Sequence, residues 1–540
     1  MLIPRAASYD EIYRSFRWQI PERYNIAWDV CDRHAQDPHA LALIHERPDG
    51  SVDRYSFRQI QGFAHRLANL LLARGLKTGD RVLLYLGQHP ATAIAHVACW
   101  KAGLVSVPCS VLFGVEALDY RIENTGALAL LTDLENYPAV AEAQRKSPRL
   151  RTILLVDGEA PDTLPFWPSL ERASDGFTTR TLSPQDPAFI NYTSGTTGWP
   201  KGALQGHRSI LGHMPGAEFV YDFFPQDRDV MWSPADWSWI AGLMDVLMPA
   251  WFHGKPVLTY RASKFDPEQA FHMIGKHGVR TSFLTPTMLK MMRQVADPVR
   301  RFGVDLRAVM SGGESVGKEI LEWANRTLGA AVNEAYGQTE CNLVLGNCAR
   351  VLAPKPGSLG RALPGHVAAI VDDTGLPVPV GEVGNIAFRR PDPVMMLEYW
   401  RNPNATAEKF AGDWLITGDL GFSDEEGYFW FRGRADDVIT SAGYRIGPWE
   451  IEDALMRHPA VAMAAVIGVP DPVRTESIKA FIVPAPGVVP NAELADEIRD
   501  SVRTRLAKHE YPRAIEFVET LPMTATGKIL RRELHAREKK

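Results

Sequence analysis

The sequence predicts an α/β protein that continues into a strand-rich part and ends in a small α+β module. Helical and strand patterns alternate from Ser56 to about residue 333, as they do in proteins whose parallel sheets are covered by helices. After about residue 365 the pattern becomes rich in strands that Gly and Pro turns divide. From Pro448 the expected order is helix, strand, strand, helix and strand, which makes a compact module.

A capping box marks the first helix of the alternating region: Ser56 and Gln59 precede apolar residues at helical spacing, and Gly75 closes the helix. Its apolar positions are Ile60, Phe63, Leu67 and Leu71. Short apolar runs then predict strands at residues 81–86, 104–108, 127–132 and 152–157, with a helix near residues 91–101 between the first two.

The same rhythm continues in the second half of the alternating region. We expect strands at residues 230–233, 282–284, 306–310 and 331–333, and helices near residues 268–277 and 318–327. In open α/β sheets, ligands collect at the carboxyl ends of strands. The loops at residues 193–201 and 311–315 follow expected strands, so we expect ligand contacts there.

The strand-rich part and the final module complete the element order. Strands are expected at residues 367–372, 385–389 and 428–431, and then in the module at 461–467, 479–483 and 515–517, with module helices at 449–456 and 492–506. We place the domain boundary at the charged residues 434–437. This gives an N-terminal domain of residues 1–435 and a C-terminal domain of residues 436–540.

Composition excludes several classes of protein. The 540 residues are 45% hydrophobic and 23% charged, which argues against disorder, and the net charge of −5 gives no case for binding nucleic acid. The longest apolar stretches, residues 244–252 and 460–469, are shorter than the about 20 residues of a membrane span. The N-terminus lacks a signal peptide, so we expect a cytoplasmic protein with no membrane contact. Five cysteines show no CxxC spacing and predict reduced, mostly buried thiols.

Residues 192–202, with the sequence YTSGTTGWPKG, predict a loop that handles phosphates. Glycines let backbone N–H groups turn toward an anion, hydroxyls add neutral donors and Lys201 adds charge. The loop is not a Walker A motif, because Pro200 stands where that motif needs Gly and Gly202 where it needs Ser or Thr. A flexible surface turn is the alternative, since Gly, Ser and Thr dominate ordinary loops.

Four further segments place polar residues after expected strands or near the C-terminus: residues 311–315, 336–340, 414–419 and 524–528. Glu340 suits magnesium, which holds phosphates through one or two carboxylates and waters, and Asp419 ends an expected strand where a carboxylate can accept ribose hydroxyls. Taken singly, residues 311–315 fit an ordinary turn equally well, and Glu340 and Lys528 are better interpreted as solvated side chains.

Together the segments resemble the adenylate-forming superfamily of acyl-CoA synthetases, luciferases and peptide-synthetase adenylation domains. The matching motifs occur in the family's order: residues 193–201, 336–340, 417–419, 434–445 and 522–528. Residues 441–448, 458–461 and 470–474 look most like the medium-chain acyl-CoA synthetases, with acetyl- and propionyl-CoA synthetases next. The resemblance implies two α/β sheets and a β subdomain in the N-terminal domain, and a mobile C-terminal lid that rotates about Asp436.

The resemblance also implies a reaction with ATP, Mg²⁺ and coenzyme A, in which a small carboxylic acid becomes an acyl-AMP and then a thioester. Its catalytic residues would be Lys528, Thr339 and Glu340, with Glu340 as the metal ligand. ATP and AMP would contact Thr193, Ser194, Gly195, Thr196, Thr197, Gly198, Lys201, Gly312, Gly313, Glu314, Tyr336, Asp419 and Arg434, and coenzyme A would contact Gly443 and Arg445. The resemblance further makes Lys528 a candidate for a lysine acetyltransferase and admits a homodimer.

The acyl pocket is expected to involve Trp237, Trp239 and Cys341. If the two tryptophans line it, their bulk favours a short- to medium-chain or branched acid, but core packing is an equal alternative for Trp237. Asp236 leaves open a stand-alone adenylation enzyme that loads an acyl or amino acid onto a carrier protein. A nucleotide sensor without catalysis is disfavoured, because Lys201, Glu340, Asp419 and Lys528 are all present. A luciferase-like oxygenase stays open, because it shares every nucleotide motif.

Overall fold

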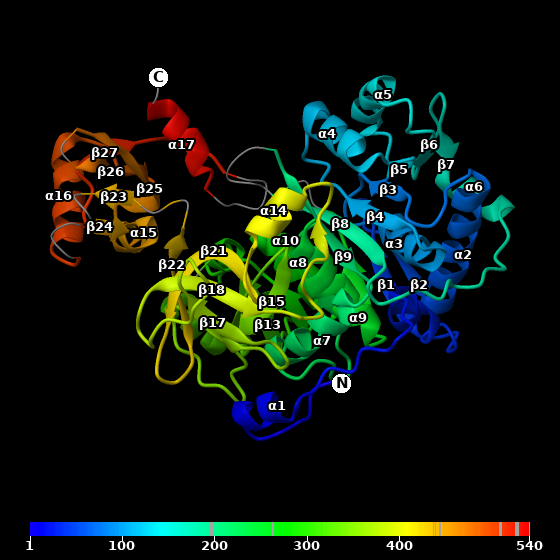
Figure 1. The fold of residues 1–540 in the computed structure, drawn as a ribbon, viewed down its shortest axis with the longest axis horizontal. Helices are drawn as coiled ribbons and strands as arrows, with labels where there is room; N and C mark the ends of the chain where they lie inside the picture. Colours follow the sequence, from blue (N-terminus) through cyan, green and yellow to red (C-terminus); the bar gives the residue numbers. More distant parts are fainter. Residues whose placement is uncertain are drawn as a thin grey trace. The chain divides into compact units, whose positions relative to one another are not determined.

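The computed structural model describes residues 1–540 except 194–198, 262–263, 315, 436, 438, 442–443, 473, 507–509, 524–528 and 539–540; the side chains of residues 440, 444, 445, 449 and 450 are likewise not described (Figure 1). The chain divides into two compact units. Within the described residues, the first comprises residues 1–193, 199–368 and 389–413, and the second comprises residues 369–388 and 414–538.

The first unit contains an eight-stranded sheet in the order β19-β9-β8-β4-β3-β5-β6-β7. Its strands are β3 (Arg81–Leu84), β4 (Val105–Pro108), β5 (Ala129–Thr132), β6 (Thr152–Leu155), β7 (Leu164–Pro165), β8 (Pro187–Thr193), β9 (Lys201–Gly206) and β19 (Glu398–Tyr399). The helices of this region are α2 (Phe57–Ala73), α3 (Pro90–Ala102), α4 (Val115–Thr125), α5 (Tyr137–Lys146) and α6 (Phe166–Arg172). Strands β3 to β7 run parallel, whereas β9 pairs antiparallel with β8 and with β19.

Local sequence explains the helices of this sheet. The predicted capping box is present in α2, where Ser56 accepts from the Gln59 N–H and the Gln59 side chain accepts from the Ser56 N–H. Every residue of α3 is buried, so the helix shows no polar face, and Gly103 ends it in the left-handed conformation with φ 68°. A helix without a polar face gives no amphipathic signal, and its position agrees with the helix expected near residues 91–101.

A second run of strands in the first unit has the order β16-β15-β14-β13-β12-β10-β11-β1-β2. The strands are β1 (Leu41–Glu46), β2 (Val52–Ser56), β10 (Met231–Trp232), β11 (Val257–Thr259), β12 (Thr281–Phe283), β13 (Ala308–Gly312), β14 (Ala331–Gln338), β15 (Cys341–Gly346) and β16 (Ser358–Ala362). Strands β10 to β14 and β1 pair in parallel, and β2, β15 and β16 are antiparallel to their neighbours.

Helical segments accompany this second sheet. They are α7 (Ser209–Val220), α8 (Ile240–Gly242), η2 (Leu243–Leu247), α9 (Met248–Phe252), α10 (Pro267–His277), α11 (Pro286–Met292), α12 (Pro298–Phe302), α13 (Lys318–Trp323) and η3 (Ala324–Leu328). The helix expected at residues 318–327 is therefore an α-helix that continues as a π-helical turn. The first unit also contains α1 (Tyr9–Ser15), η1 (Trp28–Asp32), α14 (Pro403–Glu408) and the short strand β20 (Phe410–Ala411).

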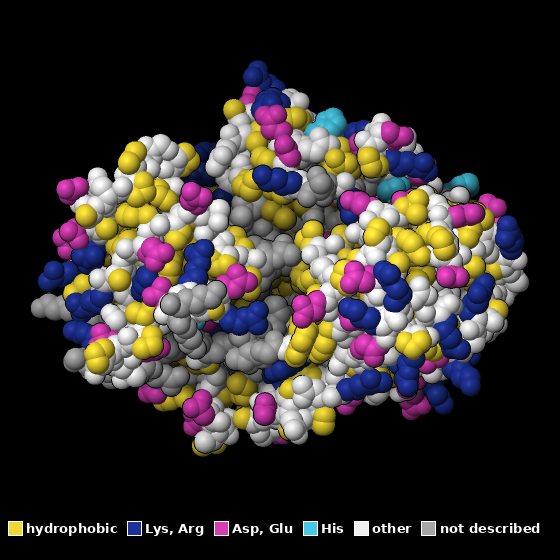
Figure 2. Space-filling view, turned by 90° about the horizontal axis from the view of Figure 1, so that it is seen from above, with side chains coloured by type: hydrophobic (Ala, Val, Ile, Leu, Met, Phe, Trp, Pro, Cys, Tyr) yellow, Lys and Arg dark blue, Asp and Glu magenta, His cyan; other side chains and the backbone are white. Residues whose placement is uncertain are grey.

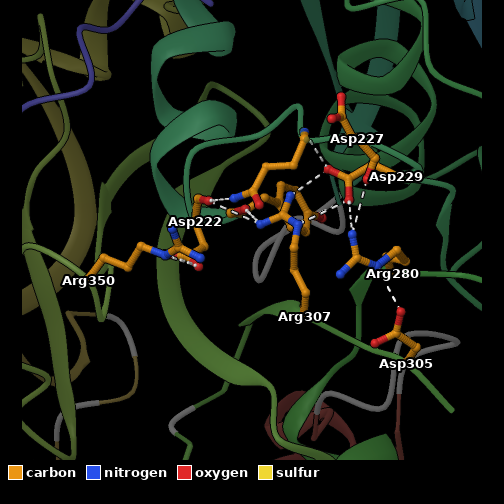
Figure 3. Close-up of polar contacts among 9 residues, drawn as sticks. Asp222, Asp227, Asp229, Arg280, Asp305, Arg307 and Arg350 are labelled. Carbon is orange, nitrogen blue, oxygen red and sulfur yellow. Dashed lines mark hydrogen bonds and ion pairs between the residues drawn. The ribbon is translucent and has the colours of Figure 1, made fainter.

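Ion pairs hold the amino ends of the parallel strands together (Figure 3). Arg307, which precedes β13, binds both oxygens of Asp229 at 3.0 and 2.6 Å and donates to the backbone carbonyls of residues 221 and 222. Arg280, which precedes β12, pairs with Asp305 at 3.1 Å, and Asp222 pairs with Arg350 at 2.7 Å. A cavity of about 480 Å³ is lined by charged groups of this cluster, namely Asp222, Arg280, Asp305, Arg307 and Arg350. Their charges already satisfy one another, so the cluster is structural.

The second unit contains strands in the order β17-β18-β21-β22 and a separate five-stranded sheet in the order β24-β23-β26-β25, with β27 beside β26. The strands are β17 (Ala368–Val371), β18 (Gly384–Arg389), β21 (Trp414–Ser423), β22 (Phe429–Arg434), β23 (Ile439–Ser441), β24 (Tyr444–Ile446), β25 (Val461–Asp471), β26 (Thr475–Pro484) and β27 (Ala514–Phe517). Helices α15 (Pro448–Met456), α16 (Ala492–Arg503) and α17 (Arg531–Glu538) accompany the five-stranded sheet. Its core includes Ile451, Leu455, Val466, Ile482 and Ile498.

The expected α/β fold with a larger N-terminal part and a smaller α+β C-terminal part is confirmed. One element differs: we expected a strand that ends at Asp419, but β21 continues to Ser423 and places Asp419 in its interior. Among the residues that the structure describes, no helix is both long and apolar enough to cross a bilayer. On the face shown in Figure 2, acidic and basic side chains are interspersed over the described surface, in keeping with the small net charge.

All five cysteines are free and buried, as predicted. Burial raises the pKa of Cys31, Cys109 and Cys348 to about 12 and raises the pKa of Cys99 and Cys341 further. The thiols are therefore protonated and inert at neutral pH.

Candidate active site

The base of the predicted phosphate loop is an antiparallel hairpin. Thr193 ends β8 and is the register partner of Lys201, which begins β9. Beside the loop, the exposed Trp199 ring stacks on Tyr120 with ring centroids 4.7 Å apart, and the Tyr120 hydroxyl donates to the Pro200 carbonyl at 2.9 Å. The loop residues Ser194, Gly195, Thr196, Thr197 and Gly198 lie outside the described residues.

Thr339 and Glu340 form the tight turn between β14 and β15, where Gln338 and Cys341 are register partners. The Gln205 side chain donates to the Thr339 carbonyl at 2.7 Å and the Met396 N–H donates to the Glu340 carbonyl at 2.8 Å. The turn is therefore tied to β9 and to the segment before β19.

The Glu340 carboxylate is 7% exposed and accepts a hydrogen bond from the hydroxyl of Tyr399. The ring of that same tyrosine lies beneath Lys201, whose Nζ is 5.4 Å from the ring centroid. The structure thus brings the loop lysine and the turn carboxylate to one aromatic side chain.

The glycines at the end of β13 have a packing role. Gly312 is the register partner of Ala335 in β14, and a Cβ at Gly312 would lie 2.5 Å from the Ala335 carbonyl oxygen. Gly313 follows with φ 89°, a conformation that favours glycine, and Glu314 accepts from the Thr287 hydroxyl at 3.0 Å. The side of Gly312 that would carry a Cβ therefore faces the neighbouring strand β14.

Tyr336 lies within β14, two residues after the buried Glu334. Burial raises the pKa of Glu334 to about 8, although the Val316 N–H donates to its carboxyl at 3.3 Å. This carboxyl is therefore largely neutral at pH 7.

In the second unit, Asp419 and Arg434 are register partners in the antiparallel strands β21 and β22. Arg434 Nη1 lies 2.9 Å from Asp419 Oδ1, and the carboxylate is buried while the guanidinium is partly exposed. The pair brings together two residues that we expected to hold a ribose.

Family models match most of the chain. The model described as AMP-binding enzyme matches residues 31–400, and the model described as AMP-binding enzyme C-terminal domain matches residues 450–528. The chain belongs to the AMP-binding enzyme family. The predicted resemblance to adenylate-forming enzymes is thereby confirmed.

Relatives of this AMP-binding enzyme match over nearly their whole length. Acetyl-coenzyme A synthetase of Bacillus subtilis (strain 168) is 34% identical, with 98% of this chain and 95% of the relative covered. The human mitochondrial acyl-coenzyme A synthetase ACSM3 is also 34% identical, with 98% and 92% covered. The crystal structure of an anthranilate CoA ligase in complex with anthranoyl-AMP superposes with a TM-score of 0.88 at 27% identity, covering 96% and 98% of the two chains. These relatives confirm the predicted class of acid–thiol ligase.

The segment that we expected at the acyl pocket of this AMP-binding enzyme is well packed. Trp237 is 1% exposed, and Trp239 makes an edge contact with Phe113 at a centroid distance of 5.9 Å. Cys341 is buried, and its neighbour Asn342 donates to Asp245 at 2.9 Å. Complete burial of Trp237 is what core packing requires, and a pocket role for this tryptophan stays a prediction.

The alternative based on Asp236 concerns a half-buried carboxyl of the same segment. Burial raises its pKa, and its Oδ1 accepts from the Ser238 N–H at 2.7 Å. A Cβ at Gly87 would lie 2.9 Å from its other oxygen, so that oxygen faces Gly87.

Three predicted residues of the C-terminal part, Asp436, Gly443 and Lys528, lie outside the described residues, and Arg445 is described only as part of the backbone of β24. Among the described residues of this part, Arg531 bridges Glu452 at 2.7 Å and Asp437 at 3.0 Å.

Tyr399 was missed by sequence reasoning. It lies 59 residues from Glu340 in the chain, and no local pattern in its segment indicates a contact with a distant carboxylate. Only the pairing of β19 with β9 brings it beside Lys201.

Proposed function

We propose that this AMP-binding enzyme is an AMP-forming acyl-CoA synthetase. It joins a carboxylic acid to the α-phosphate of ATP, releases pyrophosphate, and passes the acyl group from AMP to the thiol of coenzyme A. The observation that carries the proposal is the match to acyl-CoA synthetases over 98% of this chain. Each unit supports the proposal by itself, because the first offers the charges of Lys201 and Glu340 and the second offers the Asp419–Arg434 pair. These are charges that can hold a magnesium–nucleotide complex.

Magnesium fits the residues present. The described residues contain no group of three or more His, Cys, Asp or Glu that could hold a metal ion. Mg²⁺ needs no such group, since it typically takes one or two carboxylates with phosphates and waters, so the single buried Glu340 suffices as its protein ligand. When bound, the ion neutralises phosphate charge.

The residues of the site divide the work of adenylation. The loop from Thr193 to Lys201 holds the β- and γ-phosphates, and Thr339 contacts the α-phosphate. Lys528 bridges the attacking carboxylate and the α-phosphate, which offsets the repulsion between two anions. Adenine lies among Gly312, Gly313, Glu314 and Tyr336.

The C-terminal domain of residues 436–540 acts as a lid with its hinge at Asp436. Rotation replaces Lys528 by Gly443 and Arg445, so that one small domain serves adenylation and then thioester formation. Gly443 leaves room for the pantetheine arm because it has no side chain.

The acid is short- to medium-chain, with branched acids included, because Trp237, Trp239 and Cys341 would leave a short pocket. The enzyme works in the cytoplasm, as a homodimer, and a lysine acetyltransferase that modifies Lys528 would remove its charge.

The decisive experiment measures AMP release across straight, branched and aromatic carboxylic acids, with and without coenzyme A. AMP release that depends on both the acid and coenzyme A supports the proposal. Acid-dependent pyrophosphate exchange together with AMP release that requires a carrier protein and not coenzyme A would instead identify a carrier-loading adenylation enzyme. Absence of exchange with every acid would identify a nucleotide sensor.

A further inference from the structure

We propose that Tyr399 is a positioning residue that presets the magnesium carboxylate Glu340 through its hydroxyl and the loop lysine Lys201 through its ring. This inference rests on the proposed function, because it takes Glu340 as the metal ligand and Lys201 as a phosphate ligand. It adds Tyr399 to the site and assigns its hydroxyl and its ring to two different partners.

The backbone of Tyr399 is fixed beside the strand that begins with Lys201. Tyr399 is the register partner of Ala203 in the β19–β9 pair, and its N–H donates to the Thr406 hydroxyl at 2.9 Å. The next N–H along the chain, that of Trp400, donates to the Gly202 carbonyl at 2.7 Å. The side chain is 4% exposed, so its position is set by the fold before any nucleotide binds.

The hydroxyl of Tyr399 donates a hydrogen bond to one oxygen of Glu340. A carboxylate that is 7% exposed is costly to keep charged without a donor, and this hydroxyl provides one at Oε1. A carboxylate accepts at both oxygens, so the phenol bond leaves capacity for a cation. The bond also fixes the rotamer of Glu340, which removes an ordering cost from metal binding.

The ring of Tyr399 makes a cation–π contact with Lys201. The ammonium lies 5.4 Å from the ring centroid, within the range in which an aromatic face attracts a cation. Lysine has a flexible four-carbon stem, so a fixed ring beneath it narrows the positions of its charge. Because hydroxyl and ring act on different partners, substitution can separate them.

The test uses calorimetric titrations of ATP into the full-length protein, in EDTA and over a series of Mg²⁺ concentrations. Tyr399→Phe removes the hydroxyl and keeps the ring, and we expect it to raise the Mg²⁺ concentration for half-maximal stabilisation of the complex about tenfold. Its affinity for metal-free ATP should equal that of the unaltered protein. Tyr399→Leu removes both groups and should in addition weaken the binding of metal-free ATP about threefold or more.

Tyr24→Phe is the matched control, because the buried Tyr24 hydroxyl donates to a carboxylate, that of Asp29, at 2.7 Å. Equal Mg²⁺ dependence of Tyr399→Phe and Tyr24→Phe would overturn the role of the hydroxyl. Equal affinity of Tyr399→Phe and Tyr399→Leu for metal-free ATP would overturn the role of the ring. If Tyr399→Leu does not fold, Lys201→Met in the Tyr399→Phe background removes the cation instead of the ring. A loss of affinity for metal-free ATP below threefold would then overturn the role of the ring, because the ring would have no phosphate-binding lysine to position.

Failure of the proposed function gives a different result. The unaltered protein would then bind Mg²⁺–ATP yet release no AMP with any acid and coenzyme A. In an active enzyme, Tyr399→Phe should raise the Mg²⁺ concentration for half-maximal rate and leave KM for the acid unchanged.

Discussion

Asp419 and Arg434 face each other across two neighbouring strands, with Arg434 Nη1 2.9 Å from Asp419 Oδ1. The arginine is 35% exposed and the aspartate 8% exposed, so water screens the pair on one side only. Adjacent strands hold both side chains rigidly, which suits a site that must recognise the fixed geometry of a ribose.

Asp419→Asn should weaken ATP binding about tenfold, because hydrogen bonds to a charged acceptor are lost. If Asp419 accepts from both ribose hydroxyls, the preference for ATP over 2′-deoxy-ATP should shrink in the variant. Calorimetry with the two nucleotides measures this. Asp453→Asn breaks the exposed pair of Asp453 with Arg457 and should leave both affinities unchanged. An undiminished preference for ATP in Asp419→Asn would contradict the ribose assignment.

Lys528→Ala should abolish adenylation and spare thioester formation from supplied acyl-AMP. The reason is that the lysine offsets charge in the first step alone. Pyrophosphate exchange measures the first step, and release of AMP from synthetic acyl-AMP with coenzyme A measures the second. Equal loss of both steps would refute the assigned role.

Glu334→Gln should make the stability of the protein less dependent on pH. Burial raises the pKa of Glu334 from the ordinary 4.5 to about 8. Between these values the unfolded chain loses a proton that the folded chain keeps, so the free energy of unfolding falls as pH rises through this window. At about 1.4 kcal/mol per pKa unit, the loss reaches up to about 5 kcal/mol at pH 8 and is absent near pH 4.

The melting temperature of the glutamine variant should therefore exceed that of the unaltered protein at pH 8 and equal it at pH 4. Scanning calorimetry at the two values checks this, with the exposed Glu425→Gln as the control. A difference in melting temperature that is the same at both pH values would show that packing, and not protonation, distinguishes the variants.

Lys101→Met should destabilise the first unit by about 3–5 kcal/mol, because it leaves the carboxylate of Asp32 buried without its cation. Lys101 is fully buried in α3 and pairs with Asp32, which also accepts from Thr179 at 2.8 Å and Gln61 at 2.7 Å. The midpoint of urea unfolding measures the effect. The double variant Lys101→Met with Asp32→Asn should recover part of the loss, whereas Arg293→Gln, which breaks an exposed pair with Glu319, should cost little. Equal shifts for Lys101→Met and Arg293→Gln would contradict the prediction.

The sequence predicted those parts of the fold whose signals are local. The capping box of Ser56 and Gln59 and the apolar runs of β3 to β6 have short-range patterns, and these elements were found within a few residues. Strand β21 was cut short because Gly418 and Asp419 look like the start of a turn, while pairing with β22 carries the strand on to Ser423.

For the site, motif residues such as Lys201, Glu340 and Asp419 could be named from sequence, but their partners could not. The hydrogen bond between Tyr399 and Glu340 joins segments that are 59 residues apart, and the contact of Asp419 with Arg434 depends on the register in which β21 pairs with β22. The order of the motifs along the chain predicts the family, whereas the contacts that orient each side chain depend on tertiary structure.

The burial of all five cysteines offers an experimental handle. A maleimide dye reacts with thiolates, which these protonated and enclosed side chains do not supply. A cysteine introduced at an exposed position of the proposed lid, for example Glu493→Cys, and another in the first unit, for example Glu135→Cys, would be labelled in the presence of the native thiols. Energy transfer between two such dyes could then follow the proposed lid rotation during single turnovers, with no need for a cysteine-free background.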